Sequence, residues 1–291
     1  MGESRISLAG SVVTCLTNIV LNAALIYGMG WGVFGAGLAS LLAKGIGGGF
    51  LLICLGMGER SVGLRKFAGL PRESFIVRNI MRLAVPMALE DGIFHVGKLL
   101  VQGVVTSYGT TAIAANAVSN VITLFSILPG QAICLAVTTV IARCVGAGDY
   151  EQAKYYNKKL ILLTHIGMVI TIFIVFITLP FILKVYNLSE AASEATRHII
   201  WFHGFCAILI WAESFTLPAT FRACGDAKAC MIISTVSMWI FRVGASYILG
   251  KNLGLGVFGV WVAMIIDWAF RSLLFGIRYF SGKWKKHALV S

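Results

Sequence analysis

Charged residues are scarce in this sequence, at only 12% of its 291 positions. A soluble domain carries about one quarter charged residues, because it has to cover its surface with polar groups. Apolar residues instead fill 58% of the positions, and the mean hydropathy is +0.86. These values exclude an ordinary soluble domain and indicate an integral membrane protein.

The sequence also lacks the residue patterns of disulfide frameworks, metal sites and enzymes. Its seven cysteines are odd in number, scattered, and mostly placed inside apolar runs, so we interpret them as small packing residues. No Ser-His-Asp set or spaced His and Cys cluster occurs. We therefore expect no enzyme, no cofactor and no resident metal ion.

Long apolar runs are abundant. About 20 helical residues cross the ~30 Å hydrocarbon core of a bilayer. The runs are continuous rather than alternating, which favours helices over barrel strands. Together they predict an all-α polytopic membrane protein of about eight transmembrane helices, at residues 6–28, 33–56, 80–105, 113–142, 160–183, 196–221, 229–250 and 256–280.

The basic residues predict how these helices are oriented. Of the 24 Lys and Arg residues, sixteen lie in or beside alternate connecting segments, starting with the amino terminus, and three lie in or beside the remaining connections. This asymmetry is typical of the positive-inside rule, so both termini are expected in the cytoplasm of a multi-pass protein of the cell (plasma) membrane. The net charge of +12 is dispersed among apolar segments, which argues against a nucleic-acid partner.

One glycine pattern occurs twice in the chain. GWGVFG at 30–35 and GLGVFG at 254–259 both fit G-x-G-x-x-G, the pattern of a dinucleotide-binding turn. Each lies between two apolar runs, with no strand before it. We interpret both as tight hairpin turns in which glycine permits a positive φ.

The recurrence extends beyond the turns. GVFGAGLASLL at 32–42 matches GVFGVWVAMII at 256–266, which predicts two parallel copies of one helix pair. Four runs, at 80–221, lie between the two copies and almost nothing precedes the first, so equal halves would require about four more helices, or ~145 residues, before Met1. The predicted organisation is the last two helices of a truncated amino-terminal lobe (1–56), a cytoplasmic linker (57–79), a complete six-helix carboxy-terminal lobe (80–280) and a basic cytoplasmic tail (281–291).

An ordered set of segments resembles the multidrug and toxic compound extrusion (MATE) transporters: RLAVPMALE (82–90), GTTAIAANAVSN (109–120), PGQAI (129–133), VGAGDYEQAK (145–154), FRACGDAK (221–228) and GVFGVWVAMIIDWAFR (256–271). The resemblance implies a twelve-helix antiporter of two six-helix lobes. Such a protein exports organic, often cationic compounds or drugs in exchange for Na⁺ or H⁺ by alternating access. Here the counterpart of the first four helices is lacking, which places transport by this fragment alone in question.

Ionisable residues in the run 80–105 are the first site candidates, because charge inside a bilayer usually marks an ion or substrate path. At 100° per residue, Glu90, Asp91, His95, Lys98 and Gln102 lie within one arc of 140°. The resemblance assigns Glu90 to cation coupling, with Na⁺ as a transient ligand. The alternative is a purely structural salt bridge from Glu90 or Asp91 to Lys98. Counting ten residues from position 80 places Glu90 ~15 Å deep, near the middle of the bilayer.

Further candidates lie in two later runs. Glu213 resembles the acidic residue of the family's tenth helix. Asn116 and Asn120 form an i, i+4 pair, with Gln131 further along the same run, and these amides either line a cavity or join helices.

Two other functions compete with transport. The chain could be a non-transporting membrane remnant, or an assembly subunit without a complete translocation path. It could also be a membrane enzyme acting on lipid, although it offers no nucleophile with a paired base.

Overall fold

The computed structural model describes residues 4–57, 74–282 and 284, and no β-strand occurs among them. Segments 58–73, 283 and 285–291, with most of the expected linker and basic tail, lie outside the described residues. The helices are α1 (Ser4–Asn22), η1 (Ala23–Gly28), α2 (Gly32–Met57), α3 (Ser74–Thr106), α4 (Thr110–Gly146), α5 (Tyr150–Tyr186), α6 (Glu190–Ala223), α7 (Ala227–Ser237), η3 (Met238–Gly244), α8 (Ala245–Tyr247), η4 (Ile248–Asn252) and α9 (Gly256–Phe280).

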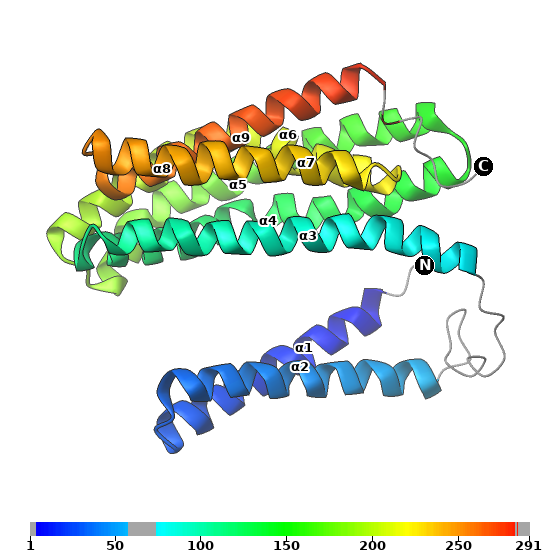
Figure 1. Ribbon diagram of the computed structural model, residues 1–291. Helices are drawn as coiled ribbons and strands as arrows, with labels where there is room; N and C mark the ends of the chain where they lie inside the picture. The colour runs from blue at the N-terminus through cyan, green and yellow to red at the C-terminus, as the bar shows by residue number, and fades with distance from the viewer. Residues whose placement is uncertain (1–3, 58–73, 283, 285–291) are drawn as a thin grey trace. The chain divides into compact units, whose positions relative to one another are not determined.

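Contacts divide the chain into two compact units, Met1–Glu73 and Ser74–Ser291. In the first unit, α1 and η1 pack against α2 as a helical hairpin (Figure 1). In the second unit, α4 packs against α5 and α6, α6 packs against α9, and α3 lies beside α7 (Figure 1). The core of this bundle is rich in large side chains, including the buried indoles of Trp211, Trp261 and Trp268.

Among the described residues, seven helices are long and apolar enough to cross a membrane, which confirms a multi-pass, all-α protein. The run expected at 80–105 corresponds to α3, which has the length of a span at 33 residues but is not among the seven. It also begins at Ser74, six residues earlier than expected, so the end of the expected linker 57–79 is helical.

The two G-x-G-x-x-G segments form matching turns. Gly30 and Gly32 have φ of +69° and +48°, and Gly254 and Gly256 have φ of +70° and +55°. The backbone bonds also match at an offset of 224: Trp31 N–H donates to Leu25 O, and Leu255 N–H donates to Leu249 O. Both segments are therefore hairpin turns, as expected, and the local structure repeats along with the sequence.

The third glycine of the second turn allows a close helix approach. A Cβ atom added to Gly259 would lie 2.8 Å from the carbonyl carbon of Leu249 and 2.9 Å from its oxygen. Because those atoms are backbone, they cannot move aside as a flexible side chain would. The glycine is required here by helix packing.

We predict that Gly259→Ala lowers the stability of the purified chain by about 1–3 kcal/mol, the usual cost of overpacking. Thermal unfolding in detergent measures the effect. Gly276→Ala is the matched control, because Gly276 lies in the same helix α9 and has open space where the Cβ would be. Equal unfolding temperatures for the two variants would contradict the packing argument.

The run expected at 229–250 is not a uniform α-helix. It runs continuously from Ala227 to Asn252, with π-helical segments η3 and η4 inside it. Within this stretch the N–H of Ala245 bonds to Ile240 O, an i→i−5 bond that changes the direction of nearby side chains. π-Helical segments often occur at functional sites, and η3 carries Arg242.

Candidate functional site

Glu90 forms an ion pair that joins α3 to α6. Its Oε1 accepts a hydrogen bond from Arg222 Nη2 at 2.7 Å. Glu90 is 7% exposed, and its second oxygen, Oε2, is buried without a hydrogen-bond partner in the described part of the chain. The expected alternative, a salt bridge to Lys98, is therefore wrong for Glu90.

The ion pair joins the end of one helix to the middle of another. Arg222 is the last residue but one of α6, whereas Glu90 is the seventeenth of the 33 residues of α3. The depth expected for Glu90 in the bilayer stays a prediction. Each partner follows a proline by four residues, Pro86 in α3 and Pro218 in α6. Because proline removes a helical hydrogen bond, both helices have a natural bending point within one turn of the pair.

The other polar side chains of this face of α3 are exposed. They are Asp91, His95, Lys98 and Gln102. Asp91 forms no ion pair with Lys98 among the described residues, so the expected salt bridge is wrong for Asp91 as well. Lys98 Nζ instead lies 5.1 Å from the ring centre of Phe94.

A cavity of about 200 Å³ brings together four of the predicted site residues, Lys98, Gln102, Asn116 and Asn120. It lies between α3, α4, η3 and α9. Trp261 Nε1 donates to Asn116 Oδ1 at 3.1 Å, and Asn116 Nδ2 donates to Gln102 Oε1 at 3.1 Å. Asn116 therefore lines the cavity and joins α4 to α3 and α9 at once, so for Asn116 the two expected alternatives do not exclude each other.

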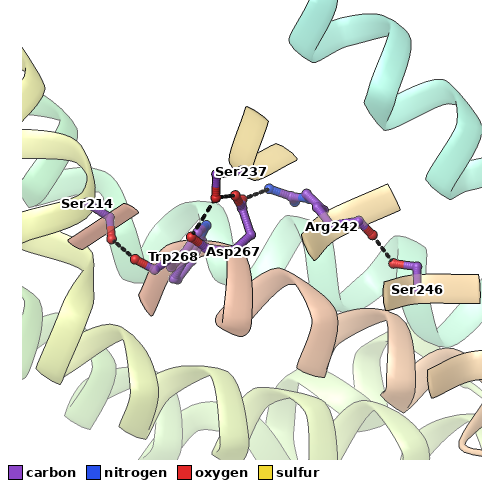
Figure 2. A network of polar contacts seen from close by, with 6 residues as sticks. All are labelled: Ser214, Ser237, Arg242, Ser246, Asp267 and Trp268. Atoms are coloured by element: carbon purple, nitrogen blue, oxygen red, sulfur yellow. Dashed lines mark hydrogen bonds and ion pairs between the residues drawn. The ribbon is translucent and has the colours of Figure 1, made fainter. Parts of the chain in front are cut away.

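Arg242 of η3 also lines this cavity, and sequence reasoning did not assign it. Figure 2 shows the polar network behind it: Arg242 Nη1 lies 3.9 Å from Asp267 Oδ2, and Ser237 Oγ donates to the carboxylate of Asp267. Asp267 is 0% exposed. The available signal was a charge inside an apolar run, because Arg242 and Asp267 interrupt the last two spans.

Glu213 and Gln131 lie outside the cavity. Glu213 Oε1 is 3.5 Å from His165 Nε2 of α5, and its Oε2 is buried without a hydrogen-bond partner in the described chain. Gln131 is exposed on α4. The structure thus places the expected acidic residues at two separate positions, Glu90 beside Arg222 and Glu213 beside His165.

The turn between α6 and α7 is held to α9 by charge. Asp226 Oδ2 accepts a hydrogen bond from Arg278 Nε at 2.6 Å. This ion pair fixes the turn that follows Arg222, so it helps to position the partner of Glu90.

A family model described as MatE matches residues 86–248. A relative from Thermotoga maritima, "Probable multidrug resistance protein NorM", is 27% identical over 100% of this chain and 63% of its own length. One from Bacillus subtilis, "Probable multidrug resistance protein YoeA", is 25% identical over 99% of this chain and 63% of its own. The chain thus spans about 63% of the length of these relatives.

Solved structures share the fold. The outward-facing conformation of a multidrug resistance MATE family transporter of the MOP superfamily aligns with a TM-score of 0.83 at 20% identity, covering 98% of this chain and 64% of that one. The family model matches more than half of the chain, and the fold agrees with it. This protein therefore belongs to the MatE family, the multidrug and toxic compound extrusion transporters.

Proposed function

We propose that this chain acts in secondary active export, moving organic compounds across the plasma membrane in exchange for Na⁺ or H⁺ by alternating access. The observation that carries the proposal is the Glu90–Arg222 pair, a buried carboxylate with one unsatisfied oxygen that joins two helices of a membrane bundle. The names of the relatives, which describe multidrug resistance proteins, support export as the process.

Coupling at this pair follows from competition. Na⁺ or H⁺ arriving at Glu90 neutralises the carboxylate that holds Arg222, so the cation favours a state in which α3 and α6 are no longer tied. Without the cation, the 2.7 Å ion pair favours the tied state. Such a difference in affinity between two states is what lets a ligand drive a conformational change.

Pro86 and Pro218 give the two states a structural basis, because each helix can bend within a turn of the ion pair. Glu213 and His165 offer a second cation site, since one oxygen of the Glu213 carboxylate is unsatisfied in the described chain. In this proposal Glu90 is the principal coupling residue and Glu213 a secondary one.

The cavity that holds Lys98, Gln102, Asn116 and Asn120 is the proposed compound-binding site. The family resemblance favours organic cations or drugs as the cargo. The cavity itself is lined by two cationic side chains, Lys98 and Arg242, and by no carboxylate of the described chain.

Orientation is the second part of the proposal, with both termini cytoplasmic, on the strength of the basic-residue asymmetry. The exposed turn between α4 and α5 then faces the cytoplasm. Labelling of a cysteine placed at Ala147 by an impermeant thiol reagent, applied outside intact cells, would contradict this orientation.

Efflux from liposomes that contain the purified chain tests the proposal. A panel of fluorescent organic compounds is loaded inside, an inward Na⁺ or H⁺ gradient is imposed, and an ionophore that collapses the gradient is the control. Efflux that requires one of the gradients is expected. A non-transporting membrane subunit would give no gradient-dependent efflux of any compound, and that result would overturn the proposal.

A further inference from the structure

We propose that the cavity between α3, α4, η3 and α9 binds the anionic group of an organic solute, a carboxylate, sulfonate or phosphate. This inference rests on the proposed function, since it takes the cavity as the binding site of the exported compound. It goes further by assigning the charge of that compound, opposite to the cations that the family resemblance favours.

Two side chains of like charge line the cavity. Lys98 Nζ and the guanidinium carbon of Arg242 lie 5.1 Å and 5.5 Å from the centre of the same Phe94 ring. Both residues line the cavity. Like charges repel each other, and an anion bound in the cavity would relieve that repulsion.

The nearby carboxylates offset only part of this charge. Asp267 faces Arg242 at 3.9 Å, but it is fully buried and does not line the cavity, and Arg271, a further buried cation, follows it by one turn of α9. Glu90 is already paired with Arg222. Asp91 lies seven residues from Lys98 along α3, or about 10 Å at 1.5 Å per residue.

The hydrogen-bond order gives the cavity further donors. An indole N–H can only donate, so Asn116 Oδ1 must accept from Trp261. The amide nitrogen of Asn116 is therefore the group that faces Gln102 Oε1. The side-chain oxygen of Gln102 therefore accepts this hydrogen bond, and its NH₂ group remains as a donor. That NH₂ group has no acceptor among the described residues.

One acceptor also faces the cavity. Asn120 Nδ2 donates to the backbone oxygen of Asn116 at 2.8 Å, so the side-chain oxygen of Asn120, Oδ1, is the atom left without a donor among the described residues. The donors of Lys98, Gln102 and Arg242 outnumber this acceptor. Such a set matches the oxygens of an anionic group, and charge-assisted hydrogen bonds of this kind are the stronger ones.

The remaining wall of the cavity is apolar. Val101, Val260, Met264 and the ring of Trp261 line it. An apolar wall beside a few directed polar groups is typical of a site for an organic molecule rather than a small inorganic ion. The chemistry recognised is therefore an anionic group on an apolar scaffold.

Equilibrium binding of two matched probes tests this inference on the full chain in phosphatidylcholine nanodiscs. The probes are naphthalene-2-sulfonate and 2-naphthyltrimethylammonium, which share the ring and differ in the sign of their charge. We expect the sulfonate to bind at least about tenfold more tightly, the order expected for a charge-assisted contact. Equal binding, or tighter binding of the ammonium probe, would overturn the proposal.

Lys98 is the residue to change, because its side chain is exposed and forms no ion pair in the described chain. Lys98→Gln should weaken sulfonate binding about tenfold, and Lys98→Glu should reverse the preference in favour of the ammonium probe. Lys251→Gln, which changes an exposed lysine of η4 outside the cavity, is the control and should bind as wild type does. Unaltered sulfonate binding in both Lys98 variants would show that the probe sits elsewhere.

Lipid headgroups carry the same anionic chemistry as a free solute, so a second set of nanodiscs includes phosphatidylglycerol. If phosphatidylglycerol competes with the sulfonate, the site binds a lipid headgroup. If it does not compete, the site binds a free solute. Both results uphold a site for an anionic group. The binding assay needs no ion gradient. Loss of gradient-driven efflux with sulfonate binding retained would therefore refute the proposed function and leave the charge preference intact.

Discussion

Glu90→Gln should abolish ion-coupled efflux while leaving the protein inserted in the membrane and folded. Glutamine keeps the size of the side chain but removes the charge that holds Arg222 at 2.7 Å. The cation then no longer binds the two conformational states with different affinity, so the ion gradient cannot drive the change between them. We expect gradient-driven efflux to fall to the ionophore-treated background, at least about a hundredfold in rate, or ~2.7 kcal/mol in the barrier.

The neighbouring acid provides the control. Asp91 is exposed and follows Glu90 in the sequence, and it has no ion-pair partner among the described residues. Asp91→Asn removes the same charge from the same turn of α3, and it should retain most of the efflux. If Glu90→Gln and Asp91→Asn transported equally well, Glu90 would be a packing residue.

Asp267→Asn should give the largest loss of stability of any single charge neutralisation in the bundle. The carboxylate is 0% exposed, accepts from Ser237 and lies 3.9 Å from Arg242, with buried Arg271 one turn away. Its removal leaves the half-buried Arg242 and the buried Arg271 without this counter-charge. Breaking a buried ion pair from one side costs about 3–5 kcal/mol.

Thermal unfolding of the purified variants in detergent measures this loss. Asp149→Asn is the control, because Asp149 is exposed and caps α5 by accepting from Gln152 N, a role that asparagine also performs. An Asp267→Asn variant as stable as Asp149→Asn would mean that Asp267 carries no charge needed by the two arginines.

Local and periodic features of this fold could be predicted from the sequence. Continuous apolar length identified the helices, and the repeated glycines identified two turns whose positive φ values match. Helical spacing also placed Lys98 and Gln102 on one face of α3 and Asn116 beside Asn120 on α4, and the structure brings these two faces to one cavity. These predictions need only the period of a helix and the conformational freedom of glycine.

The partners of the charged residues could not be predicted in the same way. Glu90 and Arg222 are 132 positions apart, and spacing within α3 instead pointed to Lys98. Arg242 reaches the cavity from a π-helical segment, and the regular period of an α-helix does not predict its direction. Pairing across the bundle depends on which helices are neighbours, and no single span contains that information.

Equilibrium binding of radioactive sodium at mildly alkaline pH, paired with proton uptake as the pH is lowered, tests the coupling role of Glu90 most directly. Arg222 competes with the cation for the same carboxylate, so wild type should bind it weakly and Arg222→Gln more tightly. Glu90→Gln should lose this binding and the matching proton uptake. Cation binding and proton uptake in Glu90→Gln equal to those of the wild type would contradict the account.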